Sequence, residues 1–192
     1  MTTRTTSPGL LPAIAERWSP RAFDGSAVPQ ADLDLILEAA GLAPSAFNYQ
    51  PWTFLYAHKG DANWEAFLSY LIPFNAGWAK EAGVLAFVVS ENDMVQGEKT
   101  SPNHSHSFDA GAAWGYAALQ AKALGYDTHG MSGIDMDKAI AGLGIPASHR
   151  LEAAFVIGKQ GDKAILPDFL QAREAPAPRK PVAAIARAGA FG

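Results

Sequence analysis

The sequence predicts a single domain in which helices and buried strands share one core. Its 192 residues are enough for one sizeable core, and 48% of them are hydrophobic against 18% charged. Residues 30–40 show helical spacing, because their apolar side chains recur at intervals of three and four. Almost unbroken apolar runs at 84–89 and 151–157 are typical of strands buried on both faces. The chain therefore mixes the two kinds of element.

Composition excludes several classes of function. The formal net charge is −4 and no basic cluster stands out, which argues against a nucleic-acid partner. The chain has no cysteine, so disulfides, thiol nucleophiles and thiolate metal sites are excluded. No apolar stretch reaches membrane-spanning length, and the run from Leu10 to Ala15 contains Pro12 and lacks a basic start. We expect no signal peptide, no membrane partner, a frayed start over residues 1–8, and a cytoplasmic protein.

The first candidate site is the segment Arg17-Trp18-Ser19-Pro20-Arg21. Arg17, Ser19 and Arg21 alternate, and alternate side chains of an extended or turning backbone point the same way. Pro20 favours that geometry because proline restricts the residue before it. Arginine matches a phosphate well, since its planar fork of donors stays charged. The motif indicates a phosphate site, and two solvated surface arginines are the alternative interpretation.

A stiff polar loop lies between the helix of residues 30–40 and a β-prone run at 53–57. Its two prolines fix φ and disfavour helix in the residues before them. Such a loop loses little entropy on binding, so its hydroxyl and amide side chains suit a polar ligand. The residues concerned are Pro44, Ser45, Asn48 and Gln50. An ordinary helix-to-strand connection is the alternative interpretation.

The middle of the chain carries a second helical stripe and the most polar stretch. Apolar spacing predicts a helix over 64–71, and another short helix is predicted within 74–83. Residues 91–107 contain His104-Ser105-His106, and alternate histidines can ligate a metal. No third ligand stands at a recognisable spacing. We interpret 91–107 as a mobile surface loop, a candidate lid over a site, and expect no metal.

A long helix rich in small residues is predicted over 108–124. Glycine inside a helix costs about 1 kcal/mol relative to alanine. The presence of Gly111 and Gly115 inside a helix therefore needs an explanation, and close approach of another backbone at these positions would provide one.

The last part of the chain alternates between extended and helical segments. Residues 126–131 are expected to be extended, and Asp135 can cap the helix that follows. A strand at 151–157 and a short helix at 167–173 come next. Residues 175–181 contain three prolines and should run extended across a surface.

Four motifs in order resemble the FMN-dependent nitroreductase family. They are Arg17-x-Ser19-x-Arg21, Pro44-Ser45-x-x-Asn48-x-Gln50-Pro51-Trp52, the Gly-Met-Ser-Gly-Ile-Asp segment at 130–135, and Arg179-Lys180-Pro181. The resemblance covers most of the chain as a single domain. It implies an α+β fold with a mostly antiparallel central sheet flanked by helices. It also implies an intertwined homodimer with two FMN molecules at the interface and with residues 175–192 as an arm that crosses onto the partner.

The resemblance implies roles for the charged and hydroxyl residues and for the segment after the extended run. Arg17, Ser19 and Arg21 match ligands of the FMN phosphate and ribityl chain, and Arg179 closes on the phosphate. Ser132 and Gly133 match the catalytic pair that faces the isoalloxazine ring, where the glycine N–H points toward N5. Many relatives carry glutamate at the place of Ser132.

The polar loop also has counterparts in that family. Asn48 matches the asparagine that contacts the flavin, and Gln50 stands in the same cofactor-binding loop. Pro44 and Ser45 match positions that reach the flavin bound mainly by the other subunit. The small-residue helix at 109–124 resembles the long helix packed at the dimer interface.

By the same resemblance the protein is an enzyme that uses NAD(P)H to reduce nitroaromatics, quinones or similar electrophiles. Hydride transfer through flavin N5 would proceed by ping-pong turnover. No Gly-x-Gly-x-x-Gly fingerprint is present, so NAD(P)H has no Rossmann domain of its own. The alternatives are a reductive dehalogenase or flavin-cleaving relative on the same fold, and a non-catalytic FMN-binding protein. A phosphate-binding module without flavin is a further interpretation.

Overall fold

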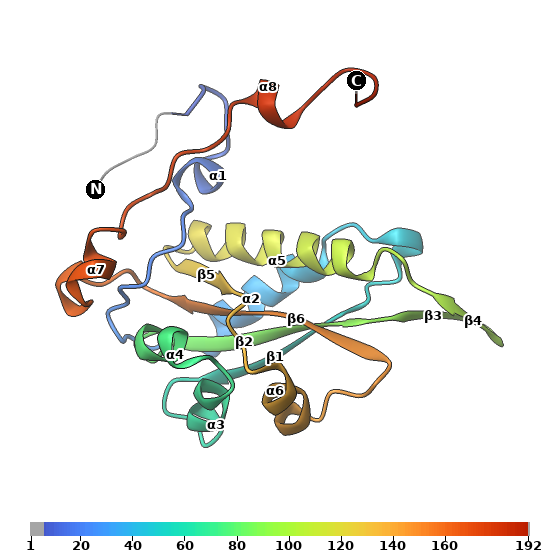
Figure 1. The fold of residues 1–192 in the computed structure, drawn as a ribbon, viewed down its shortest axis with the longest axis horizontal. Coiled ribbons are helices and arrows are strands. Elements are labelled where there is room, and N and C mark those ends of the chain that lie inside the picture. Colours follow the sequence, from blue (N-terminus) through green and yellow to red (C-terminus); the bar gives the residue numbers. More distant parts are fainter. Residues whose placement is uncertain (1–5, 192) are drawn as a thin grey trace.

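A computed structural model describes residues 6–191, which form a four-stranded sheet between two layers of helices (Figure 1). Across the sheet the strands are β1 (Trp52–His58), β2 (Val84–Glu91), β6 (His149–Gly158) and β5 (Asp127–Met131). Each strand is antiparallel to its neighbours. The predicted α+β fold with an antiparallel central sheet is confirmed.

Strand β2 is apolar on both sides because it faces two cores. Leu85 and Phe87 pack into one core, while Val84 and Ala86 pack into the other. Successive side chains of a strand point to opposite faces. A strand covered on both faces therefore needs apolar side chains at every position rather than at every second one.

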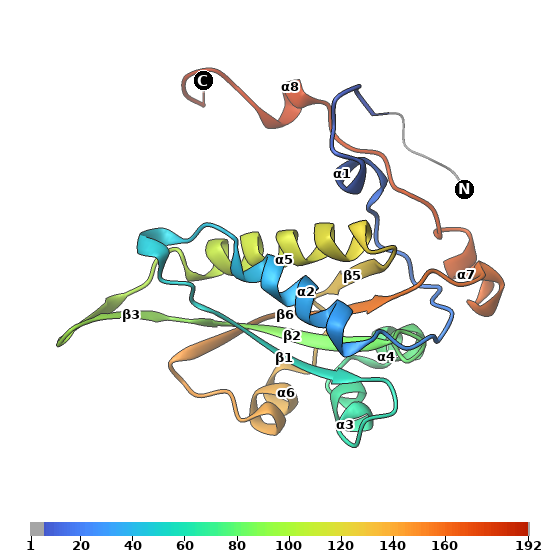
Figure 2. The same cartoon turned by 180° about the vertical axis from the view of Figure 1, so that it is seen from behind.

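Helices cover both faces of the sheet, as Figures 1 and 2 show. One face packs against α2 (Gln30–Gly41) and α5 (His106–Ala123). The other packs against α3 (Trp64–Ser69), α4 (Pro73–Ala79) and α6 (Met136–Leu143). The predicted cap of α6 is present, because the Asp135 side chain accepts a hydrogen bond from the N–H of Lys138 at 3.3 Å.

Helix α5 uses its small residues to approach the sheet closely. Ala113, Ala117 and Ala121 are fully buried against it. Gly111 and Gly115 do not serve that purpose, since a Cβ added at either would meet nothing within 4 Å. The close approach expected at these two glycines is thus not made within residues 6–191.

The stretch 91–107 differs from the loop that the sequence suggested. It contains a hairpin of β3 (Asp93–Gln96) and β4 (Lys99–Pro102), which projects from the end of β2. The hairpin stands away from both cores, so its strands need no apolar run, and their pairing was missed for that reason. Among residues 6–191, no cluster of histidine and acidic side chains could hold a metal ion.

The two ends of the chain run side by side away from the sheet (Figures 1 and 2). The N-terminal part contains α1 (Pro12–Glu16), and the C-terminal part contains η2 (Lys163–Ile165), α7 (Asp168–Gln171) and α8 (Val182–Ile185). Residues 175–181 form no helix or strand, while α8 lies within the stretch 175–192 expected to be an extended arm. Residues 1–5 of the segment expected to be frayed lie outside the described residues. None of the described helices is both long and apolar enough to cross a membrane.

Candidate functional site

The segment from Arg17 to Phe23 links α1 to the body of the domain. Phe23 is buried and forms an isolated bridge with Gln160. Within the segment, Arg17 Nη1 donates to Ser19 Oγ at 3.4 Å. The structure therefore brings together these two residues of the predicted phosphate motif.

His129 of β5 fixes this segment from the side of the sheet. Its Nδ1 lies 2.8 Å from the carbonyl oxygen of Pro20, and its ring centroid is 4.6 Å from that of Trp78. Burial lowers the pKa of His129 to about 4, and repulsion from Arg21 and Arg17 contributes. The ring is thus neutral at neutral pH, and Nδ1 carries the hydrogen because a carbonyl can only accept.

Arg179 of the C-terminal arm approaches Arg17. Burial lowers the pKa of Arg17, repulsion by Arg179 lowers it further, and Asp127 acts in the opposite direction. Arg179 Nη1 donates to the backbone carbonyls of Ala177 and Pro178 at 3.4 and 3.3 Å. Two guanidiniums that repel each other beside a serine hydroxyl form a donor set that an anion would stabilise, and a phosphate can accept from all three groups.

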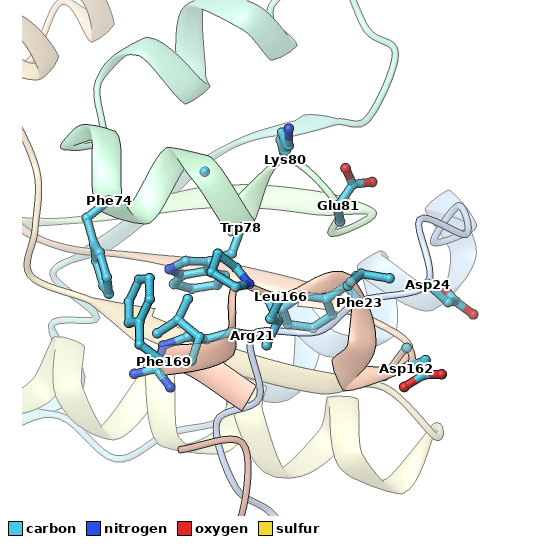
Figure 3. Close-up of a pocket in the computed structure, with 15 residues that line it drawn as sticks. Arg21, Phe23, Asp24, Phe74, Trp78, Lys80, Glu81, Asp162, Leu166 and Phe169 are labelled. Carbon is cyan, nitrogen blue, oxygen red and sulfur yellow. The ribbon is translucent and has the colours of Figure 1, made fainter. Parts of the chain in front are cut away.

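Arg21 has different neighbours from Arg17. Its Nη1 lies 4.0 Å from Glu174 Oε2, and its side chain lines a cavity of about 700 Å³. Figure 3 shows Arg21 next to Phe169 and close to Trp78. Arg21 therefore follows the predicted motif in sequence, but its guanidinium faces this cavity.

The cavity lies between α4 and the η2–α7 segment. The rings of Phe74 and Phe169 have centroids 6.4 Å apart at one end, while Asp24, Glu81 and Asp162 lie around the other end (Figure 3). Its volume is in the range of small-molecule sites. No local pattern in the sequence indicates this cavity, because its walls come from three separate segments.

The polar loop has an unusual backbone. It contains the short helix η1 (Ala46–Asn48), and Phe47, Asn48 and Gln50 all have φ of +54°. Each such residue costs of the order of 1–3 kcal/mol and persists only where the surroundings enforce it, often at functional sites. Local bonds supply part of that enforcement, since the N–H of Gln50 donates to Ser45 Oγ at 3.0 Å.

Contacts with its neighbours fix the loop against the rest of the domain. The N–H of Ala46 donates to the buried Asp109 at 3.1 Å, in the first turn of α5. The Tyr49 hydroxyl accepts from the N–H of Val95 in the hairpin at 3.1 Å. Pro44, Asn48 and Gln50 remain exposed. The loop thus presents its polar groups outward from a fixed backbone.

Ser132 and Gly133 follow directly after β5, and Gly133 is held by α4. The carbonyl of Gly133 accepts from Asn75 Nδ2 and from the N–H of Ile72, both at 3.1 Å. Its own N–H donates no hydrogen bond to any group within residues 6–191. Ser132 is exposed. The pair therefore offers one unused backbone donor and one hydroxyl at the end of an edge strand.

One chain does not gather all the predicted site residues. Arg17 lies near Asp127, just past the C-terminal end of α5, whereas the loop binds Asp109 at its N-terminal end. Eighteen residues at a rise of about 1.5 Å place the two ends of α5 about 27 Å apart. Figures 1 and 2 show α1 and η1 at opposite ends of this helix. Pro44, Ser45, Asn48 and Gln50 are thus separate from the arginine group within the chain.

Three residues that contact the predicted site had not been found from the sequence. They are Asn75, His129 and Glu174, which bond to the backbone of the predicted residues or of their neighbours. A lone asparagine, histidine or glutamate within a helix or strand pattern carries no local signal of such a contact.

The chain matches a known protein family over most of its length. The model of the Nitroreductase family matches residues 14–72 and 72–159. A solved structure described as an oxidoreductase containing FMN is 47% identical, with a TM-score of 0.95, over 100% of this chain and 99% of its own. No curated protein matches the chain.

Two further solved structures are more distant. A protein from Desulfovibrio desulfuricans, proposed to be a nitroreductase and solved in complex with FMN, is 25% identical with a TM-score of 0.74 over 97% of this chain and 100% of its own. A Bacteroides thetaiotaomicron protein, proposed to be an NADH dehydrogenase/NAD(P)H nitroreductase, shares the fold at 19% identity. Its TM-score is 0.70 over 92% of this chain and 95% of its own.

Proposed function

This chain belongs to the nitroreductase family, and on that premise we propose that it is an FMN-dependent oxidoreductase. It uses NAD(P)H to reduce nitroaromatics, quinones or similar electrophiles. The observation that carries the proposal is that the C-terminal arm, which bears Arg179, runs beside the segment of Arg17 and Ser19 (Figures 1 and 2), because these donors together suit a dianionic phosphate. The relative that is 47% identical and contains FMN supports the choice of cofactor.

The residues present fit FMN at both ends of the molecule. Arg17, Ser19 and Arg179 would hold the phosphate, and Arg21, on the same segment, is available to the rest of the cofactor. The unused N–H of Gly133 is a donor for the ring, and Ser132 exposes a hydroxyl next to it. These are the groups that a cofactor with a charged phosphate and a polar ring edge requires.

The exposed loop is proposed to contact the cofactor of a second copy of the chain. Because it lies at the opposite end of α5 from Arg17, and that helix is about 27 Å long, the loop would reach the cofactor of a partner rather than its own. Phe47 in the loop and Phe108 on α5 are 83% and 81% exposed, so an apolar surface surrounds it. We therefore assign Pro44, Ser45, Asn48 and Gln50 to the partner's cofactor in a homodimer.

Bound FMN supplies a ring that takes a hydride from NAD(P)H and passes the two electrons to the acceptor. The chain contributes binding and orientation. Asn75 and Ile72 donate to the carbonyl of Gly133 and so fix the backbone next to the N–H of Gly133, which would face the ring. His129 fixes Pro20, next to Ser19 and Arg21, through its neutral ring. Neither task requires a proton donor or a nucleophile among the side chains.

The visible absorption spectrum of the purified protein tests this proposal. We expect a flavin spectrum with about one FMN per chain, bleaching on anaerobic addition of NADPH or NADH, and recovery when a quinone or nitroaromatic is added. A flavin that neither nucleotide reduces would instead favour a non-catalytic FMN-binding protein. A protein that is colourless and takes up no FMN would overturn the proposal.

A further inference from the structure

Glu174 is a buried carboxylate at the junction between α7 and the C-terminal arm. Its side chain is only 1% exposed. Oε1 accepts from the N–H of Arg21 at 2.6 Å and from the N–H of Ala22 at 2.8 Å, which lie 153 and 152 positions earlier in the chain. A buried carboxylate is costly unless hydrogen bonds compensate its desolvation. Two charge-assisted bonds to consecutive N–H groups therefore form a strong anchor.

The second carboxylate oxygen faces the guanidinium of Arg21. Oε2 lies 4.0 Å from Arg21 Nη1, and it has no hydrogen-bond partner within residues 6–191. Burial lowers the pKa of Arg21, and the charge of Glu174 opposes that effect. Glu174 thus stabilises the charge of Arg21 without binding its guanidinium at hydrogen-bond distance. The Nη groups of Arg21 stay available for a ligand.

The same anchor fixes where the arm begins. The N–H of Glu174 donates to the carbonyl of Gln171 at the end of α7, and Leu170 of that helix is buried. Arg179 follows only five residues later, within the extended segment 175–181. The approach of Arg179 to Arg17 therefore depends on a chain that is fixed at Glu174.

We propose that Glu174 is a positioning residue that locks the start of the arm to the segment of Arg17 to Ala22 and so couples FMN binding to closure of the arm. This inference rests on the proposed function. A phosphate held between Arg17 and Arg179 bridges the segment and the arm, and Glu174 joins the same two parts of the chain. By linkage, the factor by which bound FMN strengthens the Glu174 bridge equals the factor by which that bridge strengthens FMN binding.

Two substitutions at Glu174 test how much its hydrogen bonds contribute to FMN binding. Glu174→Ala removes both bonds, and we expect it to weaken FMN binding by about tenfold or more. Glu174→Gln keeps an oxygen that can accept from both N–H groups, so its FMN affinity should lie between those of Glu174→Ala and the unaltered protein. Glu38→Gln, the same chemical change at an exposed position of α2, is the control and should bind FMN normally.

Amide hydrogen exchange gives a readout that does not depend on activity. With FMN bound, exchange at Arg21 and Ala22 should slow, and cleavage of the segment 175–181 by protease should slow with it. In Glu174→Ala this protection should be largely lost. If Glu174→Ala does not fold, the unaltered protein and Glu174→Gln still decide the question.

The outcomes distinguish this inference from the function on which it rests. If the exchange rates of the Arg21 and Ala22 amides are the same with and without FMN, in a protein that binds FMN, only the proposed coupling is overturned. The coupling is also overturned if folded Glu174→Ala retains the FMN affinity of the unaltered protein. Failure of the unaltered protein to take up FMN would overturn the proposed function, and the coupling with it.

Discussion

The Nδ1 atom of His129 lies 2.8 Å from the carbonyl oxygen of Pro20, and this bond joins β5 to the segment that carries Arg17 and Arg21. The ring is neutral at neutral pH because burial lowers the pKa of His129, and repulsion from Arg21 and Arg17 adds to that effect, while the bond to Pro20 acts in the opposite direction. The end of β5 also carries Ser132 and Gly133. One histidine thus sets the position of the segment proposed to bind phosphate relative to the strand that leads to Ser132 and Gly133.

His129 should make the stability of the fold depend on pH. Its pKa is lowered from an ordinary value of 6.5 to about 4, mainly by burial. The unfolded state therefore binds more protons between these two values, and stability that is present above the unfolded pKa is lost as the pH falls through this window. The full loss is about 3 kcal/mol. Urea unfolding at several pH values between about 7 and 4 measures it.

His129→Gln is the control for that measurement, since its amide can still donate to the carbonyl of Pro20 but does not titrate. Other groups titrate in the same window, so the difference between the two proteins is the relevant quantity. If the free energies of unfolding of the two proteins depend on pH in the same way, the pH dependence does not come from His129.

Arg179→Ala should have opposite effects with and without FMN. Without FMN it removes a repulsion felt by Arg17, so the free energy of unfolding should stay equal or rise slightly. With FMN it removes a charged hydrogen bond of about 1.5–3 kcal/mol, which weakens binding by about tenfold to a hundredfold. Fluorescence titration of the apoprotein and thermal unfolding measure the two effects. A variant that loses stability without FMN and keeps FMN affinity would contradict both parts.

Gly133→Ala should destabilise the fold whether or not a cofactor is bound. The added Cβ would lie 2.5 Å from Asn75 Nδ2 and 2.7 Å from Ile72 Cδ1. Overpacking of this kind costs about 1–3 kcal/mol. Asn75→Ala makes room, so the double variant should lose less than the two single losses combined. Chemical unfolding of the set measures the coupling.

Gly77→Ala is the matched control for the Gly133 series. Gly77 lies in α4, and a Cβ added there would meet nothing within 4 Å. Helix propensity predicts a neutral effect or a gain of up to about 1 kcal/mol. Additive losses for Gly133→Ala and Asn75→Ala would show that the two side chains do not compete for the same space.

Gly111→Ala and Gly115→Ala test whether a second chain packs on α5. Among residues 6–191, an added Cβ meets no atom within 4 Å at either position, so alanine should stabilise α5 by up to about 1 kcal/mol each. If a partner helix approaches there, alanine instead weakens the dimer, and we expect at least about a tenfold rise in the dissociation constant. Light scattering over a dilution series measures it. A dimer that is unchanged or tighter would place the interface elsewhere.

The predicted phosphate motif shows which site residues can be identified from sequence and which cannot. Arg17, Ser19 and Arg179 could be picked out because arginine and serine near proline are recognisable as residue types and by spacing. That Arg21 faces a cavity depends on segments that begin at Phe74 and Gly161, and Glu174, which holds its backbone, is 153 positions away. Nothing in the local pattern at Arg21 or Glu174 encodes that contact.

The sequence by itself determined the elements whose signal is local. The periodic helix α2, the twice-buried strands β2 and β6, and the Asp135 cap all follow from neighbouring residues, because burial and capping act over one or two turns. Tertiary structure decided the strand order β1-β2-β6-β5 and the positive φ angles of Phe47, Asn48 and Gln50. It also placed the loop and Arg17 at opposite ends of α5. These features depend on which distant segments pack together, and that is set by burying the whole apolar surface at once rather than by any single stretch.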